Sequence, residues 1–588
     1  MSKVTKEAAL KYHSSGKPGK IEVIPTKPHS TQTDLALAYS PGVAEPCLEI
    51  EKNPQTAYDY TAKGNLVAVI SNGTAVLGLG DIGALAGKPV MEGKGLLFKI
   101  FGGIDVFDIE VDEKDPEKFI QTVKAIAPTF GGINLEDIKA PECFEIERRL
   151  KAELDIPVMH DDQHGTAIIS SAALLNALDI SGKDISKIKL VVNGAGASAI
   201  ACTNLYMKFG VRKENVIMCD SKGVITTRRN DLNETKKCFA IDSDLVTLDQ
   251  AIEGADVFLG LSKADILTKE MIRKMNDTPI VFALANPNPE ISYEEAMDSR
   301  DDLIFATGRS DYPNQVNNVL GFPYIFRGAL DVRATGINEE MKMAAAKAIA
   351  QLAKEPVPDV INTAYEIKRL YFGKEYIIPK PLDPRLLATV SIAVAKAAIE
   401  SGEARKTITD WDAYEDRLVE KMGYNNTLIH RLTNLAKSDP KRVVYCEGNH
   451  INMIKAAIFS KKDGICYPIL LGSEDRIRNI AKENGLDLDG VEIIDHRNIS
   501  EDTRRAKYAE RLSEKRSREG IRYQEAFEKM SDRNYFGMMM VEAGDADAVI
   551  TGIYSHYREF ARTALEVIGL RPEFNHFAAM HIVQTKKA

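Results

Sequence analysis

The stretch IKLVVNGAGASAIACTNLYMKFGVRKENVIMCD, residues 188–220, decides the fold of this chain. It contains an apolar strand, a glycine turn, an unbroken amphipathic helix and a second strand that ends at Asp220. This is the order of a dinucleotide-binding βαβ unit, in which backbone N–H groups at the start of the helix face a pyrophosphate. The alternative is a helix–sheet turn that only needs small residues. The register of strand, helix and acid favours the dinucleotide site.

A second glycine motif, GLGDIG (residues 78–83), competes for the same role. It is followed by ALAGKPVMEGK, whose Gly and Pro predict no helix, so we expect a tight loop close to the site. Asp220 is placed to hold the hydroxyls of an adenine ribose, which favours NAD. The adjacent Lys222 could instead accommodate the 2′-phosphate of NADP, and Arg228 and Arg229 could help. The residues alone leave NAD and NADP both open.

Outside this unit, segments that predict strands continue to alternate with segments that predict helices. Apolar runs at 66–71, 75–80, 96–101 and 156–162 predict strands, separated by glycine turns and helical segments. Alternation of this kind predicts largely parallel sheets. A polar stretch near 403–428 precedes a second α/β pattern. The predicted organisation is a substrate and metal domain (1–163), a Rossmann-like dinucleotide domain (164–400, with 370–400 able to return to the first), a linker (401–429) and a further α/β domain (430–588).

Composition excludes several classes of protein. The chain has 588 residues, 44% hydrophobic and 27% charged, with a net charge of −9. A negative balance argues against a general nucleic-acid binder, and no apolar run approaches a membrane span. The N-terminus lacks the apolar core of a signal peptide, and seven Cys without a C-x-x-C pair make no disulfide framework. We expect a cytoplasmic protein.

Three carboxylates are candidate metal ligands: Glu136 and Asp137 in INLEDI, and Asp162 in HDDQHGT. Each follows an apolar strand-like run, where α/β sites collect, and oxygen ligands without thiolates suit Mg²⁺ or Mn²⁺. The alternative is ordinary surface acids and a helix N-cap. His160 and His164 are expected to pack or hydrogen-bond, because a hard cation prefers oxygen.

Other polar residues carry candidate roles. Lys94, among glycines in MEGKGLLFKIF, would be a base if burial near a metal lowered its pKa. Tyr39, on the turn of YSPG, could be a general acid. Asn286, Asn317 and Asn318 could recognise a carboxylate. Their alternatives are a surface lysine, a packed tyrosine and turn amides.

Taken together, the motifs YSPGVAEPC, GLGDIG…GKPVMEGK, LEDI, HDDQHGTA, NGAGASA, FALANP and NNVLGFPYIFRGAL closely resemble the bacterial malic enzymes over residues 10–400. Residues 430–588 are similar to the first part of a phosphotransacetylase domain. The arrangement resembles the large hybrid malic enzymes, usually NADP-dependent, whose C-terminal domain is regulatory and senses acetyl-CoA. The family pattern would continue past QTKKA, so we expect a truncated C-terminal domain, no acetyltransferase activity and weakened inhibition by acetyl-CoA.

The resemblance implies the role of each site residue. Tyr39 would be the general acid and Lys94 the general base, paired with Asp161. Glu136, Asp137 and Asp162 would bind Mg²⁺ or Mn²⁺. The pyrophosphate would lie on Gly194, Ala195, Gly196, Ala197 and Ser198, while Asn286 and Asn318 would hold the malate carboxylate. Eukaryotic relatives carry a substrate arginine before the GLGD loop, where this chain has Thr74 and Ala75.

The implied reaction is oxidative decarboxylation of L-malate to pyruvate and CO₂ with reduction of NADP, in a homo-oligomer. Rival functions are an acetyl-CoA-binding regulatory protein, a bifunctional phosphate acetyltransferase and an amino-acid dehydrogenase with a similar Rossmann half. The last would not need the three carboxylates.

Overall fold

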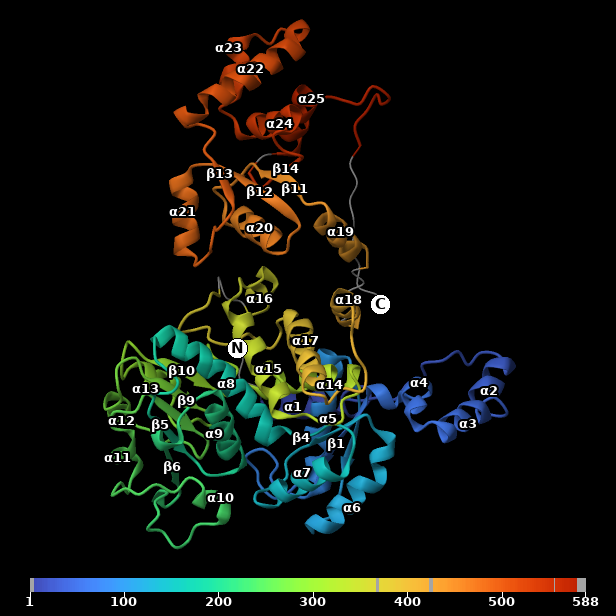
Figure 1. Ribbon diagram of the computed structural model, residues 1–588, viewed down its shortest axis with the longest axis vertical. Helices are drawn as coiled ribbons and strands as arrows, with labels where there is room; N and C mark the ends of the chain where they lie inside the picture. Colours follow the sequence, from blue (N-terminus) through green and yellow to red (C-terminus); the bar gives the residue numbers. More distant parts are fainter. Residues whose placement is uncertain (1–4, 366–369, 422–426, 555, 579–588) are drawn as a thin grey trace. The chain divides into compact units, whose positions relative to one another are not determined.

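The computed structural model describes residues 5–365, 370–421, 427–554 and 556–578 (Figure 1). They belong to two compact units, residues 1–422 and 423–588. The first unit contains one parallel and one largely parallel sheet, and the second unit contains one parallel sheet. The α/β fold with parallel sheets that the sequence predicts is confirmed.

The first sheet of unit 1 has the strand order β2-β1-β3-β4, with all pairs parallel. Its members are β1 (Leu66–Ser71), β2 (Asp105–Glu110), β3 (Gly132–Leu135) and β4 (Val158–His160). Strand β1 is buried along its whole length, as a strand covered on both faces must be. Val67 and Val69 pack toward α5 (Ala84–Gly102), while Ala68 and Ile70 pack toward α6 (Pro116–Ile126) and α7 (Glu142–Glu153).

Helix α5 and the loop before it contradict two predicted strands. Residues 96–101 lie in its last turns, and residues 75–80 form a loop with one isolated bridge between Val76 and Gly80. The sequence interpretation counted Gly and Pro89 as helix breakers. The helix forms nevertheless, because one face buries Met91, Phe98 and Phe101 against β1 and α14 (Phe322–Asp331), and tertiary packing outweighs weak helix propensity.

The second sheet of unit 1 has the order β10-β9-β8-β5-β6-β7, parallel except for the last pair. Its strands are β5 (Leu190–Asn193), β6 (Val216–Asp220), β7 (Gly223–Val224), β8 (Val257–Gly260), β9 (Ile280–Ala283) and β10 (Ile304–Thr307). The turn after β5 starts α9 (Ala197–Phe209), as the opening motif predicts. On the outer side lie α10 (Glu234–Lys237), α11 (Leu248–Ile252), α12 (Lys269–Arg273) and α13 (Tyr293–Met297).

Helix α8 (Asp161–Ser181) joins the two sheets. It begins at the residue after β4 and packs along α9 and α15 (Glu339–Lys354). Its small and apolar residues are buried nearly all round, as in a helix enclosed by protein. Further helices of unit 1 are α16 (Asp359–Ala364), α17 (Arg385–Glu400) and α18 (Trp411–Lys421). Helix α17 packs on α14, whose Phe322 and Phe326 meet Phe98 of α5 at ring-centroid distances of 4.7 and 5.3 Å.

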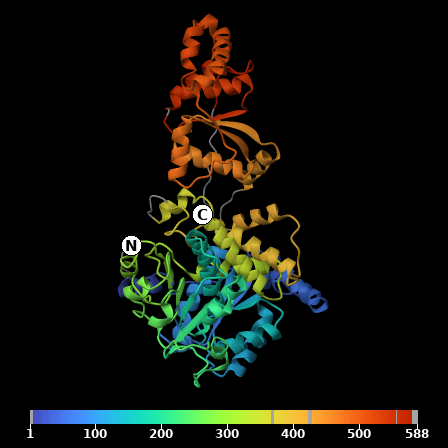
Figure 2. The same cartoon turned by 60° about the vertical axis from the view of Figure 1, so that its left-hand side comes forward.

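An arm precedes the first sheet. After α1 (Lys6–Ser14) come α2 (Gln32–Ala38), α3 (Ala44–Lys52) and α4 (Ala57–Tyr60), and none of these four helices has a buried residue. Both views show α2 and α3 extending away from the rest of unit 1 (Figures 1 and 2).

Unit 2 is a parallel sheet of order β13-β12-β11-β14 with helices on both faces. Its strands are β11 (Lys441–Tyr445), β12 (Cys466–Leu471), β13 (Glu492–Ile494) and β14 (Ala548–Ile550). Its helices are α19 (Thr427–Ser438), α20 (Ile451–Lys462), α21 (Glu474–Glu483), α22 (Asp502–Arg516), α23 (Tyr523–Lys529), α24 (Arg533–Ala543) and α25 (Tyr557–Val567). Across the described ranges of both units, no helix is long and apolar enough to cross a membrane.

Candidate active site

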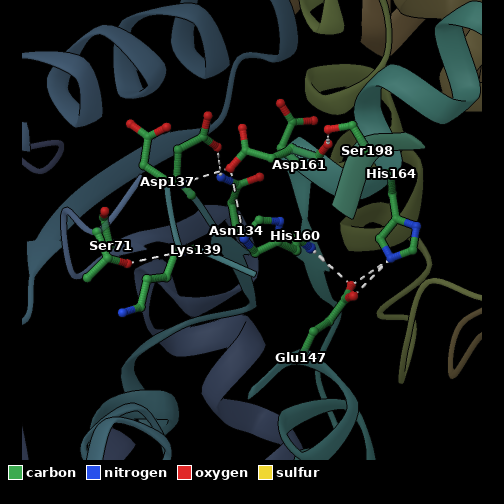
Figure 3. A network of polar contacts seen from close by, with 12 residues as sticks. Ser71, Asn134, Asp137, Lys139, Glu147, His160, Asp161, His164 and Ser198 are labelled. Atoms are coloured by element: carbon green, nitrogen blue, oxygen red, sulfur yellow. Dashed lines mark hydrogen bonds and ion pairs between the residues drawn. The ribbon is translucent and has the colours of Figure 1, made fainter. Parts of the chain in front are cut away.

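Four carboxylates meet where β3 and β4 end. Glu136 and Asp137 follow β3, and Asp161 and Asp162 open α8 directly after β4. Because β3 and β4 are paired in parallel, their carboxyl ends are neighbours, and the Asp137 N–H donates to Oδ2 of Asp162 at 2.8 Å. We call Glu136, Asp137, Asp161 and Asp162 the acid cluster. Figure 3 shows Asp137 and Asp161 around Asn134.

Lys94 projects from α5 into the acid cluster. Its Nζ lies 2.9 Å from Oε1 of Glu136 and 2.5 Å from Oδ2 of Asp161, and 4.1 Å from the ring centre of Phe322. The side chain is buried. Burial alone would lower the Lys94 pKa, but Asp161 and Glu136 outweigh it and raise the pKa above its usual value. The lowered pKa that the sequence reasoning assumed is therefore absent from this arrangement.

Three carboxylates of the cluster have raised pKa values. Burial, together with neighbouring carboxylates, raises the pKa of Glu136 to about 8 and those of Asp137 and Asp162 to about 7. Buried like charges disfavour ionisation of one another. Positive charge brought into the cluster would relieve this crowding.

Two further features are those expected of a cluster that binds a ligand. Asp137 has φ 53°, a left-handed conformation that a non-glycine residue adopts at a cost of order 1–3 kcal/mol. Oδ2 of Asp137 and Oδ1 of Asp161 are buried without a hydrogen-bond partner among the described residues. Unpaired buried carboxylate oxygens are hard donors that fit Mg²⁺ or Mn²⁺. Among the residues that the structure describes, no group of three or more His, Cys, Asp or Glu side chains is already arranged to hold a metal ion.

Neighbouring residues brace the cluster. Asn134 donates to Glu136 at 2.8 Å, and Asn318 donates to Oδ2 of Asp161 at 3.0 Å while accepting from Thr166. The structure thus brings Asn318 beside Asp161, as a substrate-binding amide would need. Asn317 caps the short turn before α14.

A buried network that sequence reasoning missed lies behind the first turn of α8. Glu147 accepts from the His160 backbone N–H and from His164 Nε2 at 2.9 Å, and Lys342 contacts His164 Nδ1 at 3.0 Å (Figure 3). His164 is therefore hydrogen-bonded through both ring nitrogens, while the His160 ring is fully buried and neither of its nitrogens has a hydrogen-bond partner among the described residues. Glu147 gave no signal, because ECFEIERRLKAE reads as a surface helix rich in charge.

The glycine turn after β5 adjoins the acid cluster. Gly194 has φ 127°, and a Cβ there would lie 2.4 Å from the Leu261 carbonyl oxygen, so only glycine fits. A Cβ on Gly196 would meet nothing within 4 Å, which leaves space at the start of α9 for a phosphate. Ser198 Oγ donates to the Asp162 carbonyl at 2.6 Å (Figure 3). That bond ties the predicted nucleotide turn to the predicted metal ligands.

Two residues with predicted roles lie elsewhere on the surface. Asn286 is exposed after β9, and its carbonyl oxygen faces Gly78 of the GLGDIG loop. Lys222 is 66% exposed and pairs with Asp231, while Asp220 is bound by Arg229 and Lys236.

Tyr39 is not brought to Lys94 within one copy of the chain. It follows the last residue of α2, on the extended arm, and is 77% exposed. The sequence could not reveal this, because a motif fixes local conformation and not where an arm points.

Comparisons with known proteins match the whole chain. Family models match at residues 18–151 (malic enzyme, N-terminal domain), 163–361 (malic enzyme, NAD binding domain) and 427–588 (phosphate acetyl/butaryl transferase). The NADP-dependent malic enzyme of Salmonella typhimurium is 53% identical over 99% of this chain and 77% of its own length. The NAD-dependent malic enzyme of Rhizobium meliloti is 48% identical over 99% of this chain and 76% of its own. The crystal structure of malic enzyme from Pyrococcus horikoshii superposes with a TM-score of 0.64 at 46% identity, over 72% of this chain and 98% of that one.

Proposed function

The chain belongs to the malic enzyme family, and from that premise we propose that it converts L-malate and NADP⁺ to pyruvate, CO₂ and NADPH in the cytoplasm. The observation that carries this proposal is Lys94, buried between Glu136 and Asp161 and tied through Asp162 and Ser198 to the nucleotide turn. A proton-transfer group, hard oxygen donors and a dinucleotide turn in one place suit oxidation of a 2-hydroxy acid.

Glu136, Asp137 and Asp162 are the residues that would hold Mg²⁺ or Mn²⁺. When bound, the cation supplies a Lewis acid for the substrate oxygens and positive charge that lowers the Lys94 pKa. The turn from Gly194 to Ser198 would hold the NADP⁺ pyrophosphate and so place the hydride acceptor at C2 of malate.

The chain's own residues would then move the protons. Lys94, as the neutral amine that the bound cation would favour, takes the proton of the C2 hydroxyl, and Asp161 holds the resulting ammonium through their 2.5 Å contact. Asn318 binds a malate carboxylate next to Asp161, and Asn286 is the second candidate for this role. After CO₂ departs, Tyr39 protonates C3.

Tyr39 can do this only from a second copy of the chain. The arm exposes Leu35, Leu37 and Tyr39, which are 58%, 68% and 77% exposed. Beside the acid cluster, the GLGDIG loop and its flanking residues expose Leu77, Leu79, Ile82 and Leu85, and the Leu77 N–H donates to Asp137. Two exposed apolar surfaces of this kind favour a homo-oligomer in which the arm of one copy covers the loop of another.

The test has two parts. NADPH and CO₂ should form from L-malate, and formation should require Mn²⁺ or Mg²⁺; no turnover with either cofactor would refute the function. Tyr39→Phe and Lys94→Ala should each be nearly inactive alone, and mixing the two proteins through dissociation and reassembly should restore activity. Failure of the mixture to recover, while each variant remains oligomeric, would contradict a shared site.

For unit 2 we propose a regulatory rather than an acetyl-transferring role. Helix α22 is rich in basic residues, as a surface for the phosphates of CoA would be, but its cations are largely paired: Arg505 with Asp502, Lys515 with Glu542, and Arg516 with Glu519 and two carbonyls of α25. These contacts favour a structural role for α22, and acetyl-CoA would bind elsewhere in the unit.

A further inference from the structure

A buried network of polar and charged side chains joins three helices behind the acid cluster (Figure 3). Its centre is Glu147, which lies on α7 and is 5% exposed. The Glu147 carboxylate accepts from the His160 backbone N–H at 3.1 Å and lies 2.9 Å from His164 Nε2. Lys151 Nζ, one turn further along α7, lies 2.6 Å from Oε1 of Glu147. The network therefore reaches from α7 to the point where β4 ends and α8 begins.

The two places that Glu147 holds lie on either side of two members of the acid cluster. His160 is the last residue of β4, and Asp161 and Asp162 are the next two residues. His164 follows in the same first turn of α8. Successive residues of a helical turn have fixed positions relative to one another. Fixing the backbone before and after the two aspartates therefore fixes where their carboxylates leave the helix.

The partners of His164 define the orientation of its ring. Nε2 faces the Glu147 carboxylate, which can only accept, and Nδ1 lies 3.0 Å from Lys342 Nζ, an ammonium that can only donate. A neutral ring with its proton on Nε2 satisfies both contacts. Lys342 lies on α15, is 3% exposed and also pairs with Glu339 at 2.9 Å. The His164 ring thus links α7 to α15 through the first turn of α8.

The surroundings of Glu147 require a carboxylate. Its three partners are a backbone N–H, an imidazole N–H and an ammonium, all of which donate, whereas an amide would turn its own N–H groups toward donors. Burial alone would raise the Glu147 pKa, but the contacts with His164 and Lys151 outweigh burial and hold the pKa well below its usual value.

Stability alone does not explain such a network. Apolar packing of the same volume is often as stable as buried charges, so their retention points to precise placement of what they hold. We call Glu147, His164 and Lys342 the α8 network.

We propose that the α8 network positions Asp161 and Asp162 and thereby sets the affinity of the acid cluster for a divalent cation. Its members hold the acids through the backbone and the first turn of α8, so they are positioning residues and not ligands. Loss of such an outer partner typically costs about 10–100-fold in metal affinity. The inference rests on the proposed function only in that the acid cluster binds Mg²⁺ or Mn²⁺.

The experiment measures the binary affinity of the full chain for Mn²⁺ by calorimetry, without malate, and the affinity for NADP⁺ in parallel. Glu147→Gln should weaken Mn²⁺ binding about tenfold and NADP⁺ binding less than twofold, because the nucleotide turn follows β5 and not β4. Glu145→Gln is the matched control, since it removes a negative charge from an exposed position of the same helix. It should leave both affinities at the wild-type values.

Two variants of His164 test the network independently of Glu147→Gln. In His164→Gln the amide N–H can donate to Glu147 and the amide oxygen can accept from Lys342, so the Mn²⁺ affinity should stay within about threefold of wild type. His164→Leu has neither group and should weaken Mn²⁺ binding as much as Glu147→Gln does.

Wild-type Mn²⁺ affinity in both Glu147→Gln and His164→Leu would overturn the inference. Equal losses of Mn²⁺ and NADP⁺ affinity in these variants would also overturn it, because they would indicate a general loss of structure. Equal Mn²⁺ affinities of His164→Gln and His164→Leu would contradict it as well. Failure of the wild-type chain to oxidise malate would refute the proposed function, while the Mn²⁺ affinities would still decide the inference.

Discussion

Both units place a buried glutamate directly after or near the carboxyl end of a parallel strand, and the two glutamates have opposite surroundings. Glu136 in unit 1 is crowded by other carboxylates, and burial raises its pKa to about 8. Glu447 in unit 2 is 2% exposed and accepts from the backbone N–H groups of Gly552, Ile553 and Tyr554.

Burial tends to raise the Glu447 pKa as well, but its backbone hydrogen bonds outweigh burial and lower it. A carboxylate satisfied by backbone donors fastens a turn to the sheet. A carboxylate crowded by others is held at a cost in stability, which points to a ligand that removes the cost. Position at a strand end alone therefore does not identify a site.

The largest effect is expected at the metal ligands. Asp162→Ala should reduce Mn²⁺ affinity by more than about tenfold and abolish metal-dependent turnover, because it removes one of three carboxylates that hold the cation. Calorimetric titration with Mn²⁺ measures this. Glu145→Ala, an exposed acid paired with Arg148 on α7, is the control and should bind Mn²⁺ normally. Equal Mn²⁺ affinity in both variants would remove Asp162 from the metal site.

The two glutamates should respond differently to neutralisation. Glu447→Gln should destabilise unit 2 by about 2 kcal/mol, since a charged acceptor for three backbone donors is lost. Glu136→Gln should destabilise the metal-free chain less, because relief of repulsion among the acids offsets the weakened contact with Lys94. Thermal unfolding in the presence of a chelator compares them, with Glu474→Gln, an exposed acid paired with Arg478, as control. Similar losses at Glu136 and Glu447 would abolish the distinction between the two regions.

The stability of the two units should also change with pH in opposite directions. In the folded state Glu136, Asp137 and Asp162 retain protons that the unfolded chain has released above about pH 4, so metal-free unit 1 should lose stability as pH rises toward about 8. Glu447 contributes stability above its unfolded pKa, and that contribution disappears as pH falls through its lowered folded pKa. Thermal midpoints of the wild type, Glu136→Gln and Glu447→Gln across this range measure both slopes. A flat difference between wild type and Glu136→Gln would argue against crowding.

The smallest effect is expected on α22. Lys515→Ala removes a pair with Glu542 that is partly exposed, and such pairs contribute about 0–1 kcal/mol. We expect a slight loss of unit 2 stability and no change in the response of malate turnover to acetyl-CoA. A clear change in the acetyl-CoA response would show that α22 contributes to the effector site.

Local sequence patterns predict much of the fold and part of the candidate site. The unit from β5 to β6 follows from a strand, a glycine turn and a helix that adjoin in the chain, and the acids after β3 and β4 follow from their apolar strands. Helix α5 was missed because the packing that stabilises it comes from β1 and α14, far away in sequence.

The electrostatic properties of the site residues could not be predicted from the sequence. The raised Lys94 pKa depends on two carboxylates 42 and 67 residues away. The hydrogen bonds that Asp220 accepts from Arg229 and Lys236 depend on a loop that brings these two residues back to the end of β6. The local segments of Glu147 and Tyr39 do not reveal their surroundings, which are set by tertiary packing for Glu147 and by the direction of an exposed arm for Tyr39.

The most direct test of the central claim, that the acid cluster around Lys94 is the catalytic centre, is the rate of NADPH formation by Lys94→Ala at saturating malate, Mn²⁺ and NADP⁺. Lys88→Ala is the matched control, because Lys88 lies on the same helix but pairs with Asp108 on β2. We predict that kcat falls ~10²–10⁴-fold in Lys94→Ala, with NADP⁺ affinity unchanged, and stays near wild type in Lys88→Ala. Near-native kcat in Lys94→Ala would contradict the account.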